Sequence, residues 1–114
     1  MGNRVYQRIE IDGLKADISD GKGFFPGVVN DVSRFGVCMV DLPSRFDEKA
    51  MRMTAVISGR NKNFKILVRP KWSGLAGTRK MVGFEIINTP FDWTDFVMQL
   101  EPREDGSVWN DRLF

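Results

Sequence analysis

Hydrophobic and polar residues alternate, or form short β-rich runs, along most of the chain between residues 9 and 88. A period of two residues is typical of strands that bury one face. Turn residues divide the region: residues 20–23 include two glycines, and Gly-Arg-Asn-Lys-Asn at 59–63 is typical of a hairpin connection. The pattern predicts five or six short antiparallel strands, within the ranges 9–18, 24–32, 36–42, 51–58, 64–68 and 80–87.

Two further features qualify these strands. Pro26 and Gly27 fall inside the second range and indicate a sheet edge or a β-bulge there. Residues 74–77 contain two glycines and are expected to separate the last two strands.

The pattern changes to helical spacing after residue 88. Thr89 is the predicted N-cap and Pro90 the first helical residue, and Pro102 indicates the end of the helix. Hydrophobic residues recur on one face between them, namely Trp93, Phe96, Val97 and Leu100. We interpret this stripe as packing against the strands, which would close into a small barrel because closure removes exposed edges.

Composition limits the chemistry that the chain can perform. Its 114 residues suit one domain, and 42% hydrophobic with 28% charged residues is ordinary for a folded protein. The chain has no histidine, and neither paired acids nor metal-ligand clusters are evident, so we expect no enzyme activity, no cofactor and no metal. The net charge of +2 is weak evidence for an anionic partner.

Targeting signals are also absent from the pattern. The N-terminus lacks the apolar segment of a signal peptide, and no window is apolar enough to cross a bilayer. A single cysteine, Cys38, excludes an internal disulfide and lies in an apolar run, where we interpret it as a small core residue. We therefore expect a cytoplasmic protein without membrane insertion.

Two short motifs hold the candidate binding residues. The first is R-x-x-x-R, formed by Arg4 and Arg8 close to the N-terminus. The second is D-x-S-x-x-G, formed by Asp31, Ser33 and Gly36. Asp31 and Ser33 are two residues apart, so on a strand both side chains point to the same face. A simple β-turn with solvated arginines would explain each motif alone but not the two together.

In this order, the two motifs resemble those of the PilZ domain family, bacterial receptors for cyclic di-GMP. The family places the arginine pair just before a six-stranded barrel and D-x-S-x-x-G at a strand and its following turn. It ends with a strand resembling residues 81–86 and then a helix, so the resemblance covers residues 4 to about 100. Val37 departs from the family, in which many members have a small residue at that position.

The resemblance implies a mainly β fold, a small six-stranded antiparallel barrel with one C-terminal α-helix. It divides the chain into a flexible ligand-binding segment at 1–8, the barrel and helix at 9–102, and a flexible tail at 103–114. Arg4, Arg8, Asp31, Ser33 and Gly36 would bind cyclic di-GMP, and ligand binding would order the N-terminal segment and change the surface offered to an unidentified downstream protein.

The chemistry agrees with such a ligand. A guanidinium fork can satisfy the adjacent O6 and N7 acceptors of guanine, or a phosphate, with two hydrogen bonds. A carboxylate can accept from the guanine N1–H and N2–H₂ donors, and a glycine permits close approach. Trp72 could stack on a base, or could equally be an ordinary barrel aromatic. Arg34, inside the second motif, is interpreted as a solvated charge.

Other functions stay open at this point. A ligand-independent protein-interaction module of the same fold is one alternative, although such domains usually have degraded motifs and both are intact here. A small RNA- or ssDNA-binding barrel is another, but the basic residues are spread along the chain and nucleic acid is the less expected partner.

Overall fold

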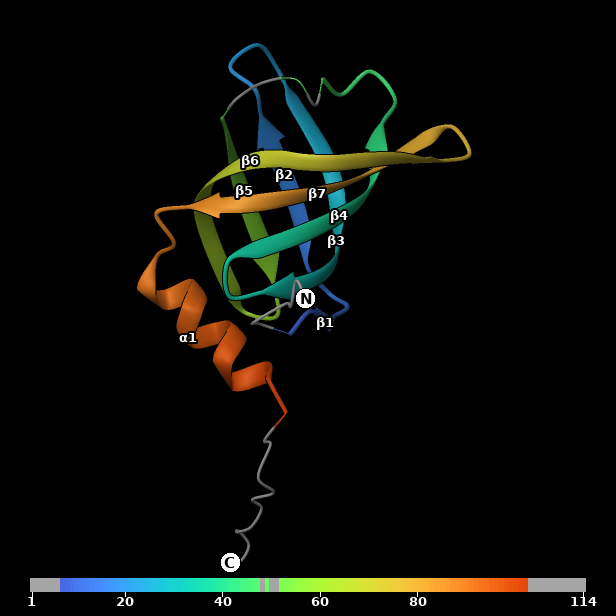
Figure 1. The fold of residues 1–114 in the computed structure, drawn as a ribbon. Helices are drawn as coiled ribbons and strands as arrows, with labels where there is room; N and C mark the ends of the chain where they lie inside the picture. The colour runs from blue at the N-terminus through green and yellow to red at the C-terminus, as the bar shows by residue number, and fades with distance from the viewer. Residues whose placement is uncertain (1–6, 48, 50–51, 103–114) are drawn as a thin grey trace, which may run out of the picture.

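Residues 7–47, 49 and 52–102 are described by a computed structural model, which consists mainly of antiparallel strands (Figure 1). The elements are β1 (Ile9–Glu10), β2 (Lys15–Ser19), β3 (Phe24–Ser33), β4 (Gly36–Pro43), β5 (Met53–Gly59), β6 (Lys62–Ala76), β7 (Arg79–Ile87) and α1 (Phe91–Leu100). The strand order is β1-β3-β2-β5-β6-β7-β4, and β4 pairs back onto β3. The last pairing closes six strands into a barrel and leaves β1 outside it. The predicted six-stranded barrel with one C-terminal helix is confirmed.

The N-terminal half of β3 forms a partial edge. Pro26 pairs with Asp17 of β2, whereas pairing with β4 begins only at Val28. A proline lacks the N–H that a second neighbouring strand would require, so its place on this one-sided stretch follows from its chemistry. The edge predicted from Pro26 and Gly27 is therefore present, but the register shift in β3 lies further along, between Val29 and Asp31.

Two local predictions need correction. The break predicted at 74–77 is present only at its end: β6 continues through Gly74 to Ala76, and the turn is made by Gly77, whose φ of +65° favours glycine, and Thr78. Thr89 is not the N-cap. Pro90 occupies that position with extended backbone angles and no side-chain cap, and the helix begins one residue later, at Phe91.

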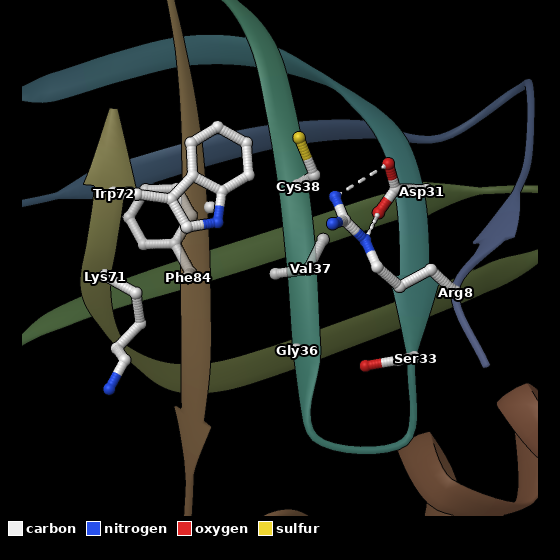
Figure 2. A pocket seen from close by; sticks show the side chains of 10 residues that line it. Arg8, Asp31, Ser33, Gly36, Val37, Cys38, Lys71, Trp72 and Phe84 are labelled. Carbon is white, nitrogen blue, oxygen red and sulfur yellow. Dashed lines mark hydrogen bonds and ion pairs between the residues drawn. The ribbon is translucent and has the colours of Figure 1, made fainter. Parts of the chain in front are cut away.

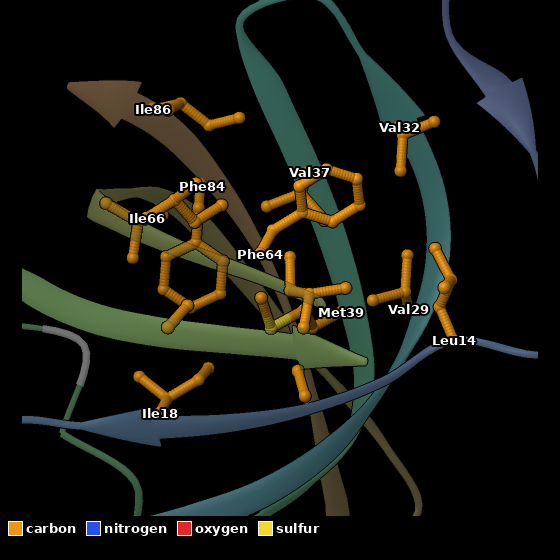
Figure 3. Packing of buried hydrophobic residues seen from close by; sticks show 14 of the residues in the cluster. Leu14, Ile18, Val29, Val32, Val37, Met39, Phe64, Ile66, Phe84 and Ile86 are labelled. Carbon is orange, nitrogen blue, oxygen red and sulfur yellow. The ribbon is translucent and has the colours of Figure 1, made fainter. Parts of the chain in front are cut away.

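The barrel interior is filled by alternate residues of every long strand (Figure 3). Val32 of β3 and Met39 of β4 are fully buried. The helix extends this core, because Trp93 and Phe96 of α1 lie against Phe64 of β6 with ring centroids 5.2 and 5.1 Å away. The predicted helical stripe is thus core packing. No helix in the described part of the chain has the length and apolar character needed to cross a bilayer.

Candidate ligand-binding site

A pocket lies on the outer wall of the barrel, over β3, β4, β7 and β6 (Figure 2). Strand register assembles its floor. Asp31 pairs with Cys38, Cys38 pairs with Gly83, and Gly83 pairs with Trp72, so four strands contribute one residue each to a single row. An acid, a thiol, a bare backbone and an indole therefore lie side by side, although they span more than 40 residues of sequence.

Arg8 reaches this row from the outside strand. β1 pairs with the end of β3 through Ile9 with Val32 and Glu10 with Asp31, which places Arg8 next to the pocket. Its Nε donates to Asp31 Oδ1 at 3.1 Å and its Nη2 to Oδ2 at 3.3 Å. The hydrogen bond to Asp31 raises the pKa of Arg8 above its ordinary value. The Arg8 side chain remains 41% exposed, whereas that of Asp31 is only 12% exposed.

Asp31 is held from two sides. Besides Arg8, the side-chain amide of Asn30 donates to Asp31 Oδ2 at 3.1 Å. Asp31 is the one charged residue among the buried residues that the structure describes. A carboxylate buried to this degree requires such partners. The contact with Arg8 also decides against an isolated turn as the explanation for D-x-S-x-x-G, because Asp31 bonds a residue 23 positions away.

Ser33 and Gly36 close the hairpin between β3 and β4 and are register partners. Ser33 lines the pocket together with Asp31, while the intervening Val32 points into the core. Gly36 does not have a positive φ, so the turn does not demand glycine for its conformation. A Cβ there would lie 3.1 Å from Phe84 O and 3.3 Å from Ser33 Oγ. Space is therefore the reason for glycine at this position.

Cys38 is buried but does not belong to the apolar core cluster. Val37 and Met39 on either side point inward, so Cys38 points outward and lines the pocket beside the Arg8 guanidinium (Figure 2). Burial raises the pKa of the Cys38 thiol, and the nearby Asp31 carboxylate adds to this rise, while Arg8 opposes it. Cys38 is therefore buried, as the apolar run predicted, but it lies on the outer face of β4 and not in the interior cluster.

Trp72 and Lys71 form the far wall. A register shift in β6 between Pro70 and Trp72 brings both residues to the pocket. The indole lies directly over Gly83, where a Cβ would be only 2.2 Å from Trp72 Cε2. Trp72 is 44% exposed, and Arg8 Cζ lies 5.9 Å from its ring centroid, within cation–π range. Lys71 Nζ lies 3.9 Å from Glu85 Oε1.

The hollow is small and open, with a volume of about 160 Å³. Enclosed sites for drug-sized ligands measure roughly 300–1,000 Å³. The pocket presents a guanidinium, a carboxylate, a hydroxyl and the exposed face of an indole. This set suits a planar group with both donor and acceptor edges, or a phosphate next to one.

Five of the six predicted binding residues line this one pocket, namely Arg8, Asp31, Ser33, Gly36 and Trp72. Arg4 lies outside the described residues. Their role as ligand contacts stays a prediction. Sequence reasoning missed Gly83 and Lys71, since only the pairing of β7 with β4 and β6 brings them to the site.

The interpretation of Arg34 as a solvated charge was wrong. Its guanidinium donates two hydrogen bonds to the Glu101 carboxylate, at 2.9 and 2.8 Å. The two residues are 67 positions apart, and no local sequence signal connects them.

The sequence matches no protein-family model and no curated protein. Solved structures do match the fold. The inhibitor of motility MotI/DgrA of Bacillus subtilis aligns with a TM-score of 0.72 and 11% identity over 88% of this chain. PlzA of Borreliella burgdorferi, solved in complex with c-di-GMP, gives 0.59 and 11% over 82%. The PilZ domain of YcgR from Escherichia coli, solved with c-di-GMP, gives 0.63 and 14% over 86%.

The extent of these matches differs. This chain spans 50% of the MotI/DgrA chain and 49% of the PlzA chain, but 88% of the YcgR PilZ domain. At these identities the likeness shows the fold alone. The chain therefore has the PilZ-domain fold that the sequence motifs predicted.

Proposed function

We propose that this PilZ-like domain is a receptor for cyclic di-GMP and has no catalytic role. One observation supports this most directly: Arg8, Asp31, Ser33 and Gly36, from two separate sequence motifs, line the same pocket. Two of the proteins that share the fold were solved with this dinucleotide.

Each group in the pocket has a matching group on the ligand. The Arg8 fork can bind guanine O6 and N7, or a phosphate, with two hydrogen bonds. The Asp31 carboxylate can accept from the guanine N1–H and N2–H₂ donors once Arg8 turns toward the ligand. The exposed face of Trp72 can stack on a base. Gly36 and Gly83 add no side chain of their own to the pocket, and Gly83 leaves room for the Trp72 ring.

The size of the pocket supports a two-part binding mode. A hollow of about 160 Å³ is too small to enclose a whole cyclic dinucleotide, since sites for drug-sized ligands measure roughly 300–1,000 Å³. One base would occupy the hollow, and the phosphates would lie above the barrel wall. Residues 1–8, with Arg4, would then close over the ligand. This ordering would change the surface that a downstream protein meets.

Calorimetric titration of the purified chain with cyclic di-GMP tests the proposal. Saturable binding is expected, with much weaker binding of cyclic di-AMP, which has the same phosphates but lacks guanine O6 and N2. Absence of saturable heat up to high micromolar ligand would reject the receptor function and favour a ligand-independent interaction module. Binding of single-stranded RNA that is insensitive to Arg4 and Arg8 would instead favour a nucleic-acid function.

Variants of the arginines locate the binding site. Arg4→Ala and Arg8→Ala should each abolish binding, whereas Arg60→Ala, which removes the same charge at the β5–β6 turn, should not. Arg8→Ala also leaves the buried Asp31 carboxylate without its cation. Arg8→Lys is therefore the sharper variant. It keeps a positive charge for Asp31 but loses the fork, and should weaken binding about tenfold or more. Normal binding by Arg8→Lys and Arg8→Ala would place the ligand elsewhere.

A further inference from the structure

The turn between β3 and β4 connects the pocket to the helix. Its first and last residues, Ser33 and Gly36, line the pocket. On the other side of the turn, Trp93 of α1 donates its indole N–H to the Ser33 carbonyl at 3.1 Å. Trp93 is fully buried and Ser33 is half-buried, so water has limited access to this bond. The backbone that presents a proposed ligand contact is therefore held from behind by the helix.

Arg34 makes the second connection, to the end of α1. Its Nε and Nη2 bind the two carboxylate oxygens of Glu101 at 2.9 and 2.8 Å. The side chains are only 27% and 17% exposed. A bidentate pair of this kind fixes both distance and orientation, so it restrains the turn more strongly than a single contact to a flexible lysine would.

The position of Glu101 indicates that the Arg34–Glu101 pair holds the β3–β4 turn and does not simply stabilise the helix. Glu101 is the C-cap of α1, and its backbone N–H donates to Val97 O and Met98 O. The C-terminus of a helix carries partial negative charge and disfavours a carboxylate. The hydrogen bond from Arg34 lowers the pKa of Glu101, so this pair favours the carboxylate that the helix end disfavours. Helix stability alone would favour a basic residue here, and the last turn of α1 has none.

We propose that Arg34 is a positioning residue for the pocket, acting through the β3–β4 turn, and that its pair with Glu101 couples helix α1 to ligand binding. This coupling rests on the proposed function, because the ligand that it invokes is cyclic di-GMP. Coupling is reciprocal. If the docked helix favours the turn geometry that binds ligand, then ligand binding favours the docked helix.

Glu101→Ala in the full chain tests the proposal by calorimetry. Cyclic di-GMP should bind about fivefold more weakly. Asp95→Ala is the matched control: it removes an acid from the same helix, where Asp95 accepts a bond only from Gln99 among the contacts described, and should leave affinity unchanged. The charge-swapped double variant Arg34→Glu/Glu101→Arg should recover most of the loss, whereas Glu101→Arg alone, which suits the helix end but repels Arg34, should not. Wild-type affinity in Glu101→Ala would overturn the proposal.

Amide hydrogen exchange provides a readout that simple destabilisation does not imitate. In the wild type, saturating cyclic di-GMP should slow exchange at residues 97–101, and this protection should disappear in Glu101→Ala. Without ligand, Glu101→Ala should speed exchange at residues 34–36. This ligand-free measurement separates two failures. If wild-type protein does not bind cyclic di-GMP, the receptor function fails, and unchanged exchange at residues 34–36 would independently overturn the link between turn and helix.

Discussion

At the scale of single residues, Gly83 makes room for the indole that forms one wall of the pocket. A Cβ at this position would lie 2.2–2.6 Å from three atoms of the Trp72 ring. Trp72 is 44% exposed, so the ring can move outward without opening the core. Gly83→Ala should therefore leave the barrel folded but displace Trp72.

The expected loss of affinity follows from stacking, which contributes about 1–3 kcal/mol per base. Gly83→Ala and Trp72→Ala should each weaken cyclic di-GMP binding about tenfold, and the double variant should be no weaker than either, because both remove the same contact. Calorimetry on the three variants checks this, with Gly74→Ala as a control, since a Cβ on Gly74 meets nothing within 4 Å. Additive losses in the double variant would contradict the shared contact.

Cys38 offers a reporter for the occupancy of the pocket. Cys38 is only 3% exposed, and burial raises the pKa of its thiol above the ordinary value of 9.0. The reactive thiolate is therefore scarcer at pH 8 than in a free cysteine. Alkylation by iodoacetamide should be at least about tenfold slower than that of a model thiol, its rate should still rise above pH 9, and cyclic di-GMP should slow it further. Fast alkylation, at a rate that cyclic di-GMP does not change, would show that Cys38 does not face the pocket.

The predicted and the missed pocket residues differ in how they reach the site. Asp31, Ser33 and Gly36 lie within six consecutive residues, so strand alternation and one turn suffice to bring them together. Gly83 joins them only through its register with Cys38 and Trp72. Register between strands depends on side chains across the whole sheet, and a single sequence does not display it.

At the scale of elements, the β5–β6 hairpin depends on a glycine outside the site. Gly59 has a φ of +137°, and a Cβ there would be 1.9 Å from the carbonyl oxygen of Gly13. Backbone, unlike the end of a side chain, cannot move aside cheaply. Gly59→Ala should therefore destabilise the protein by roughly 3 kcal/mol or more, because the strained φ and the clash of the new Cβ with the Gly13 carbonyl oxygen add together.

Gly74→Ala is the matched substitution for this hairpin. Gly74 lies in the exposed part of β6 without a positive φ and with open space around it. Alanine there should change stability by less than about 0.5 kcal/mol. Urea unfolding of both variants measures the difference. Equal stability of the two variants would mean that Gly13 does not approach Gly59 as described.

The elements that the sequence predicted well are those with local signals. The alternation of hydrophobic residues located β3, β4, β5 and β7 and the start of β6, and helical spacing located the stripe of α1. The predicted strand at 9–18 was wrong in one respect, because residues 11–14 separate β1 from β2. The predicted range 64–68 was too short for β6, because residues from Lys71 to Ala76 are exposed and show no alternation. The prediction of Thr89 as N-cap was wrong for a different reason. Pro90 has the extended backbone angles of an N-cap, which shifts the helix start by one residue.

At the scale of the whole molecule, one strand joins the core to the pocket. β3 points Val32 inward and Asp31 and Ser33 outward, and it pairs with β1, β2 and β4 in turn. The closing pair of β3 with β4 makes the outer wall a continuous surface across β7 to β6. Rigid placement of the pocket therefore depends on closure of the barrel. Closure in turn depends on the buried residues at both ends of the barrel, including those of α1.

Trp93 tests this dependence because it belongs to the core and also bonds the β3–β4 turn. Its ring packs against Phe64 at 5.2 Å and Phe96 at 6.0 Å, and its Nε1 donates to Ser33 O. Trp93→Phe removes volume and leaves a carbonyl without its donor, which should cost about 2–4 kcal/mol of stability in urea unfolding.

Phe96→Leu separates the two contributions of Trp93. Phe96 belongs to the same aromatic cluster and is 7% exposed, but its side chain has no polar atom to offer the turn. It should lose stability through packing, about 1–2 kcal/mol, and keep its affinity for cyclic di-GMP. Trp93→Phe should lose both stability and several-fold affinity, because the freed Ser33 carbonyl loosens the turn that presents the pocket. Equal affinity in the two variants, measured by calorimetry well below both melting temperatures, would show that the core holds the pocket through packing alone.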